Sequence, residues 1–294
     1  MAEGQGRDRW ADWLVRGRQL TYSPRQIAAM QRQLNRLRDR LLRNAKLKPG
    51  LDVLDVGAGT GLVALGAAKR LRGTGRVVAC DISHDALAHC RSEAADSRLH
   101  AAVGDASVLP FPDGRFDVVF TRSVLIYLED KAAGIRELFR VLKPGGRAVV
   151  FEPINEVWRR VSAQLRESGL YDAFRPTIDR IFDHYATSAS SRFTGWDERD
   201  LAAWFEDVGF SDVKLEYEYA SERPKPPKRI TSTARAMFAA MIGGRPNPYD
   251  PSFEELVREL LGTEADDFLE RWAELQLSTP PPTAAGLAYV TARR

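Results

Sequence analysis

The chain has 294 residues, of which 44% are apolar and 28% are charged, a composition typical of an ordinary globular protein. No apolar run approaches the roughly 20 residues that a membrane-spanning helix needs, and the charged N-terminus lacks the apolar core of a signal peptide. We therefore expect an α/β core with additional helices, in a cytoplasmic protein that has no membrane partner.

The cysteines, the histidines and the distribution of charge limit which metals, disulfides and binding partners we expect. Cys80 and Cys90 form no paired motif, and the four histidines lack the spacing of zinc ligands, so we expect no metal site and no disulfide. The net charge of +3 is uneven, because residues 1–50 carry +8 and the remainder carries −5. Such a segment can attract nucleic acid or an anionic substrate. A solvated helix surface is the simpler interpretation, and no nucleic-acid partner is favoured.

Residues 1–44 are expected to form a helical cap. Trp10, Trp13 and Leu14 indicate a short first helix, and Ser23 followed by Pro24 is typical of a helix start. Apolar residues then recur at spacings of three and four, at Ile27, Met30, Leu34, Leu37 and Leu41. Packing of this stripe on a sheet is the favoured interpretation. A short coiled-coil seam is the alternative, so the protein could be a monomer or a homodimer.

A regular alternation of strands and helices follows over residues 45–153. Strands are expected at residues 52–56, 76–80, 99–103, 116–120 and 147–151, with helices at 62–71, 83–94 and 131–142. Strands that alternate with helices over short turns predict βαβ units and a parallel sheet. Right-handed crossovers then place helices on both faces of a Rossmann-like sheet.

Beyond residue 153 the alternation is interrupted twice. Residues 154–195 are expected to form a helical lid insertion, residues 196–220 continue the core, residues 221–284 form a second helical insertion, and residues 285–294 contain the last strand. The core would then hold seven strands, with the last strand antiparallel beside the sixth. Both insertions would follow carboxyl ends of strands, the edge where open α/β sheets bind ligands. We therefore expect them to shape a substrate pocket.

The most informative motif is a glycine-rich turn that follows the first strand. Gly57, Gly59 and Gly61 follow Asp55, with Ala58 between the first two glycines. Glycines allow a tight turn and a close approach of a ligand to the backbone. The spacing differs from that of a dinucleotide-binding turn, which argues against an oxidoreductase. Asp81 ends the second strand, where an acid can accept hydrogen bonds from both ribose hydroxyls.

These residues resemble the class I S-adenosylmethionine (SAM) dependent methyltransferases, most closely the small-molecule branch related to the quinone-biosynthesis enzymes. The resemblance covers roughly residues 45–153 and 195–220. Besides the glycine turn, it depends on Asp81 with Ile82, on Asp105 with Ala106, and on two later segments at residues 116–120 and 142–147. It implies a Rossmann-like fold, SAM as cofactor and methyl transfer as activity.

The resemblance also implies a role for each position. Gly57, Ala58 and Gly59 would border the aminoacid and ribose parts of SAM, within a turn that ends at Gly61, and Asp55 would orient that turn or the SAM ammonium. Asp81 would hold the ribose hydroxyls, Ile82 would lie on the adenine, and Asp105 would accept from its amino group beside Ala106. The backbone at Thr121 and Arg122 would meet the methionine end.

The acceptor side has a weaker signature, because methyl transfer mainly requires positioning of a nucleophile. Candidate catalytic residues are Tyr127, Glu152, His184 and Tyr185. Members of the family often carry histidines at the positions of Ile126 and Tyr127, so this chain lacks one general base. Glu152 could bind a substrate or cap the next helix, and a structural role is the main alternative for His184.

The aromatic and aliphatic insertions favour a small acceptor of the natural-product or lipid-like kind, with O-methylation preferred and N- and C-methylation open. Two other functions remain as alternatives. A protein or RNA methyltransferase is favoured by the basic N-terminus and by the basic segment at residues 223–229. A non-catalytic SAM-binding interaction protein would keep the same cofactor motif.

Overall fold

The computed structural model of the protein describes residues 8–17, 24–94 and 98–294. The expected helix cap Ser23 therefore lies outside the described residues. The strands are β1 (Asp52–Val56), β2 (Arg76–Asp81), β3 (Leu99–Val103), β4 (Phe116–Arg122), β5 (Leu142–Pro153), β6 (Ser211–Glu222) and β7 (Thr283–Arg293). They form one sheet in the order β3-β2-β1-β4-β5-β7-β6.

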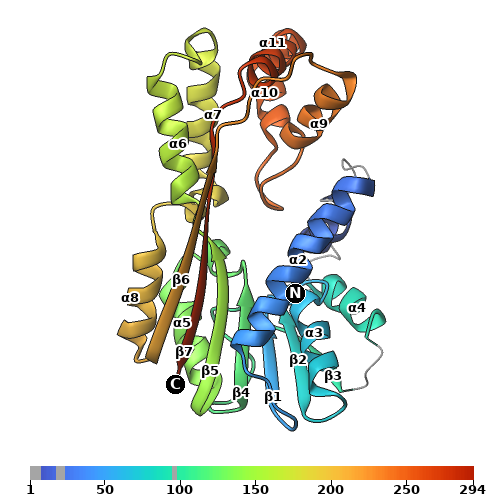
Figure 1. The fold of residues 1–294 in the computed structure, drawn as a ribbon, viewed down its shortest axis with the longest axis vertical. Coiled ribbons are helices and arrows are strands. Elements are labelled where there is room, and N and C mark those ends of the chain that lie inside the picture. Colours follow the sequence, from blue (N-terminus) through green and yellow to red (C-terminus); the bar gives the residue numbers. More distant parts are fainter. Residues whose placement is uncertain (1–7, 18–23, 95–97) are drawn as a thin grey trace, which may run out of the picture.

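The sheet is mostly parallel, as expected. Neighbouring strands from β3 to β5 are parallel, whereas β7 lies antiparallel between β5 and β6. This confirms the Rossmann-like seven-stranded sheet, including the antiparallel last strand beside the sixth. Strands β6 and β7 are longer than the alternation of residues predicted, because they continue to pair with each other beyond the rest of the sheet (Figure 1).

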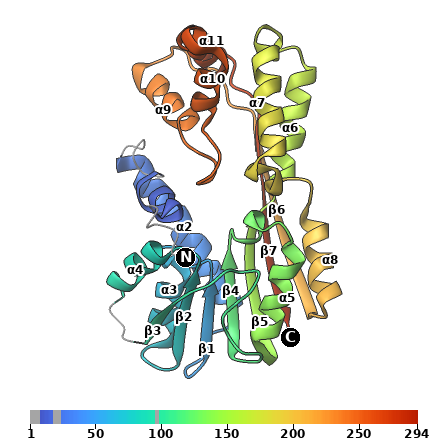
Figure 2. The same cartoon turned by 180° about the vertical axis from the view of Figure 1, so that it is seen from behind.

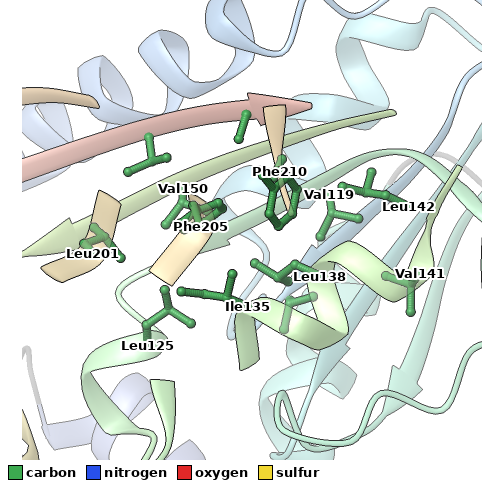
Figure 3. Close-up of a cluster of buried hydrophobic side chains, with 14 of the residues drawn as sticks. Val119, Leu125, Ile135, Leu138, Val141, Leu142, Val150, Leu201, Phe205 and Phe210 are labelled. Atoms are coloured by element: carbon green, nitrogen blue, oxygen red, sulfur yellow. The ribbon is translucent and has the colours of Figure 1, made fainter. Parts of the chain in front are cut away.

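Helices cover both faces of the sheet (Figures 1 and 2). On one face lie α2 (Pro24–Asn44), α3 (Leu62–Leu71) and α4 (His84–Ser92), and on the other lie α5 (Lys131–Val141) and α8 (Glu198–Val208). The second face holds a core in which Ile135 and Leu138 of α5 meet Phe205 of α8, and all three are fully buried (Figure 3). Full burial of each such side chain contributes roughly 1.5–3 kcal/mol.

The two insertions have an apolar core of their own. The first contains α6 (Glu156–Glu167) and α7 (Arg175–Thr187), and the second contains α9 (Ser232–Ile242), α10 (Phe253–Leu261) and α11 (Ala265–Ser278). Buried aromatic side chains such as Phe174 and Trp272 join them, with ring centroids 5.2 Å apart. Both insertions follow carboxyl ends of strands, so they stand over the edge of the sheet that carries the glycine turn (Figure 1).

The prediction that the apolar stripe of α2 packs on the sheet is correct for the C-terminal end of the helix and wrong for its N-terminal half. Leu41 is fully buried against the sheet, but Ile27, Met30 and Leu34 line a cleft instead. The reason is geometric, because the N-terminal half of the helix projects beyond the sheet toward the second insertion (Figure 2). No helix in the described part of the chain is long and apolar enough to cross a bilayer.

Candidate functional site

The glycine turn lies between β1 and α3, at the carboxyl edge of the sheet. Gly57 and Gly59 both have positive φ, at 66° and 53°, which favours glycine. A Cβ on Gly57 would also overlap Val124, which lies in the loop after β4. Asp55 is buried at the end of β1 and accepts a hydrogen bond from the Ala64 N–H at 2.8 Å. The carboxylate therefore joins the end of the strand to the first turns of α3.

Asp81 is held against this turn. One carboxylate oxygen accepts from the Gly59 N–H at 2.7 Å and the other from the Ser83 N–H at 2.9 Å. Burial raises the pKa of Asp81, and the nearby charge of Asp8 raises it further, whereas its backbone donors lower it. Each carboxylate oxygen can accept a second hydrogen bond, so the group keeps capacity for further donors.

The first helix docks on the loop that follows Asp81. This helix, α1 (Arg9–Ala11), is capped by Asp8 and continues into a π-helical segment at residues 12–17. The Asp8 carboxylate accepts from the Ser83 hydroxyl at 2.8 Å and from the Asp85 N–H at 3.3 Å. The N-terminal segment therefore lies over the end of β2.

An aromatic cluster attaches the same segment to two other loops. The Trp10 ring lies 5.8 Å from Trp13, 5.0 Å from Tyr127 and 6.0 Å from Tyr249, each edge to face. Tyr127 belongs to the loop after β4 and also contacts Phe193, with centroids 5.3 Å apart. Tyr249 belongs to the loop between α9 and α10. The first helix thus connects the glycine-turn edge to the second insertion.

Exposed apolar side chains mark the ends of β2 and β3. Ile82 and Val103 are each 54% exposed, and Val108 is 75% exposed. Asp105 is exposed between them, where its carboxylate accepts from the Ser107 N–H at 2.7 Å. Ala106 is half-buried beside it. Apolar surface next to a carboxylate suits a flat heterocycle that carries an amino group.

The loop after β4 is organised around Glu152. This side chain is fully buried, and one oxygen accepts from the Val124 and Leu125 N–H groups, each at 2.9 Å. The other oxygen accepts from the Ile126 N–H at 3.3 Å. Burial raises the pKa of Glu152 to about 7, against the opposing effect of these N–H groups and of Arg122. Glu152 therefore faces the protein interior, and the suggestion that it caps the next helix is wrong, because its oxygens serve this loop.

A cleft of about 1560 Å³ opens between this edge of the sheet, α2 and the second insertion. It is larger than the roughly 300–1,000 Å³ of most ligand pockets. Its lining includes Ala58, Gly59, Thr60, Arg122, Trp13, Leu14, Ile27, Met30, Leu34, Met241, Arg245, Pro248 and Tyr249. Asp81, Ile82 and Asp105 do not line it, and α1 docks over the loop that carries the first two.

The structure separates the catalytic candidates. Tyr127 belongs to the aromatic cluster at the edge of the cleft, and Thr121 is buried beneath the same loop. His184 lines a smaller hollow with residues of α7 and α10, away from this cleft. The Tyr185 hydroxyl donates to the Pro251 carbonyl at 3.0 Å, and burial raises its pKa. Neither His184 nor Tyr185 lines the large cleft.

Several residues of the site were not among the predicted ones. Asp8, Val124 and Tyr249 lie far from the glycine turn in sequence, and each reaches the site only through tertiary contacts. Trp13 and Leu14 belong to the N-terminal helical cap that the sequence predicts, without a predicted site role of their own, and both line the cleft. In the parts of the chain that the structure describes, no group of three or more His, Cys, Asp or Glu side chains could hold a metal ion.

Comparison with known proteins shows the family of the chain. Residues 54–150 match a methyltransferase domain family. The ubiquinone/menaquinone biosynthesis C-methyltransferase UbiE of Chromobacterium violaceum is 33% identical over 182 residues, which cover 58% of this chain and 72% of that protein. The chain belongs to the class I SAM-dependent methyltransferase family.

Two further proteins extend the comparison. The UbiE of Laribacter hongkongensis is 40% identical over 119 residues, which cover 40% of this chain and only about half, 48%, of that protein. Among solved structures, the YcgJ protein from Bacillus subtilis superposes with a TM-score of 0.56 at 17% identity, covering 87% of this chain and 97% of that one, which shows a shared fold. As a member of the class I family, the chain is a SAM-dependent methyltransferase, and its cofactor is SAM.

Proposed function

We propose that this methyltransferase acts on a small apolar or aromatic acceptor of the natural-product or lipid-like kind. The observation that carries the proposal is the cleft, in which aliphatic and aromatic side chains from α2 and the second insertion lie across from the glycine turn. Charged side chains also line the cleft, among them Arg38 of α2 and Lys69 of α3, so the acceptor would carry a polar group beside its apolar part. Its volume of about 1560 Å³ leaves room for an acceptor beside the cofactor.

We further propose which residues hold SAM. Asp81 would accept from the ribose hydroxyls, and Ile82 with Ala106 would contact the adenine while Asp105 accepts from its amino group. Gly57, Ala58, Gly59 and Gly61, oriented by Asp55, would border the ribose and methionine parts, and the backbone at Thr121 and Arg122 would meet the methionine end. The exposed Ile82 beside the exposed Asp105 carboxylate supports this arrangement.

The proposed catalysis depends mainly on positioning. Bound SAM supplies an electrophilic methyl group on a sulfonium. The protein would place the acceptor in line with that group, between the aromatic side chains of Trp13 and Tyr249 and near Tyr127. Holding two reactants in the reactive geometry can lower a barrier by roughly 7–11 kcal/mol. No general base is therefore required for an acceptor that ionises by itself.

Oxygen is our first choice for the methylated atom, in a phenol or enol whose ionised form is the nucleophile. Carbon is the second candidate, because the relatives named above are called C-methyltransferases. The ionised form of one hydroxyaromatic acceptor presents both atoms. Incubation with such acceptors and methyl-¹³C SAM would show which bond forms, because the carbon chemical shift separates the two products. The absence of S-adenosylhomocysteine with every apolar acceptor, but its formation with RNA or protein, would contradict the proposal.

A further inference from the structure

Glu152 has an unusual arrangement for a fully buried carboxylate. It is 0% exposed, and three consecutive backbone N–H groups, those of Val124, Leu125 and Ile126, donate to its two oxygens. Burying a charge is costly unless hydrogen bonds compensate. The compensation comes chiefly from one loop, with a longer hydrogen bond from the Thr121 hydroxyl of β4 at 3.5 Å, so the carboxylate and the loop stabilise each other.

This loop adopts a backbone that needs such support. Ser123 has a φ of 54°, in the left-handed region that a residue with a side chain rarely adopts. Its N–H donates to the Phe151 carbonyl at 2.8 Å, and Val124 then lies directly against Gly57 of the cofactor turn. The carboxylate of β5 therefore sets the distance between two loops that belong to β1 and β4.

Two other roles for Glu152 do not match the structure. It does not line the cleft, so it cannot touch an acceptor there. It also does not cap α6, because Asn155 occupies the cap position and Glu152 accepts its hydrogen bonds from the loop after β4.

We propose that Glu152 is a positioning residue that holds the loop at residues 122–127 in the conformation that receives the methionine end of SAM. The charges that face it are Arg122 of β4 and Lys131 of α5, and both favour the carboxylate. This inference rests on the proposed cofactor placement, in which Thr121 and Arg122 meet the methionine end.

The test compares two ligands with the full-length protein. SAM reaches both the adenosine and the methionine parts of the proposed site, whereas 5′-methylthioadenosine lacks the methionine arm. In Glu152→Gln, the side-chain NH₂ would replace one of the two acceptor oxygens. It would face a backbone N–H of the loop, and two donors cannot form a hydrogen bond with each other. The loss of one hydrogen bond to a charged group predicts a rise of about tenfold or more in the Kd for SAM. The Kd for methylthioadenosine should stay within about twofold, because the adenosine end is unchanged.

The matched control is Glu156→Gln. Glu156 is also a buried carboxylate near the end of β5, but it pairs with Arg159 and accepts from the Gly195 N–H. This variant should bind both ligands as the wild type does. Circular dichroism and thermal unfolding would check that each variant is folded. If Glu152→Gln fails to fold, Glu152→Asp keeps the charge with a shorter reach, and should weaken SAM binding selectively but less.

The outcomes distinguish a failure of the role proposed for Glu152 from a failure of the proposed cofactor placement. Equal weakening of both ligands in a folded variant would assign Glu152 a general structural role and overturn the proposal. Unchanged SAM affinity would overturn it as well, as would fast hydrogen exchange of the three loop amides in the wild type. If the wild type binds methylthioadenosine as tightly as SAM, the proposed placement of the methionine end fails instead.

Discussion

Replacement of Gly57 by alanine probes the contact between the two loops that we assign to SAM. Gly57 has a φ of 66°, so an alanine there is strained in any surroundings. The strain costs roughly 1–2 kcal/mol for a residue with a side chain. The new methyl group would also overlap the Cγ2 of Val124, with the other two Val124 side-chain carbons only 3.3 Å away.

Val124 cannot easily give way, because its own N–H is held by Glu152 at 2.9 Å. Overpacking of this kind typically costs a further 1–3 kcal/mol. Gly57→Ala should therefore lower the free energy of unfolding by roughly 2–5 kcal/mol in total. It should also raise the Kd for SAM by at least about tenfold, because either loop must shift.

Gly114→Ala is the matched control. Gly114 has nearly the same φ, 63°, but no atom lies within 4 Å of the position that its Cβ would occupy. This variant should show only the backbone strain, roughly 1–2 kcal/mol, with unchanged SAM affinity. Urea unfolding and isothermal titration would measure both quantities. Equal losses of stability and equal SAM affinities in the two variants would show that the Val124 side chain does not require a glycine at position 57.

Three further expectations follow from the same geometry. Burial raises the pKa values of Asp55 and Glu152 to about 7, so the folded state keeps protons that the unfolded state has lost above about pH 4.5. Stability should therefore rise as the pH falls from 8 to 6, by roughly 2–3 kcal/mol in urea unfolding, and a fall would contradict these assignments. Trp10→Ala should speed SAM dissociation about tenfold in stopped-flow measurements, because edge-to-face contacts of roughly 0.5–1.5 kcal/mol each are lost. The control is Trp158→Ala, on the exposed surface of α6, which should leave the dissociation rate unchanged. His184→Ala should leave kcat unchanged, and a large loss of kcat at normal SAM affinity would restore His184 as a general base.

The core of the fold could be predicted because its signals are local. The buried strand before Gly57, the turn itself and the acid that ends β2 lie within about 30 residues, and β1 to β3 begin where the alternation placed them. The insertions were also located, since their helices interrupt the alternation. Their contacts were not, because they join segments far apart in the chain, as Tyr185 and Pro251 do.

The site was predicted less completely, for the same physical reason. Glu152 was singled out by its place after β5, but its partners are backbone groups 26 to 28 residues earlier, which no residue pattern reveals. His184 was chosen by its chemistry alone, and the packing of α7 directs it to another hollow. The apolar stripe of α2 had the right period, but periodicity does not tell whether the partner is a sheet or a cleft.

The most direct test of the central claim is titration of the purified protein with SAM, repeated with Asp81→Ala. The wild type should bind SAM with micromolar affinity. The variant should bind about 100-fold more weakly or not at all, because two hydrogen bonds to a charged acceptor would be lost. Unchanged affinity in a folded Asp81→Ala protein would contradict the proposed cofactor site, and an absence of SAM binding by the wild type would contradict the account as a whole.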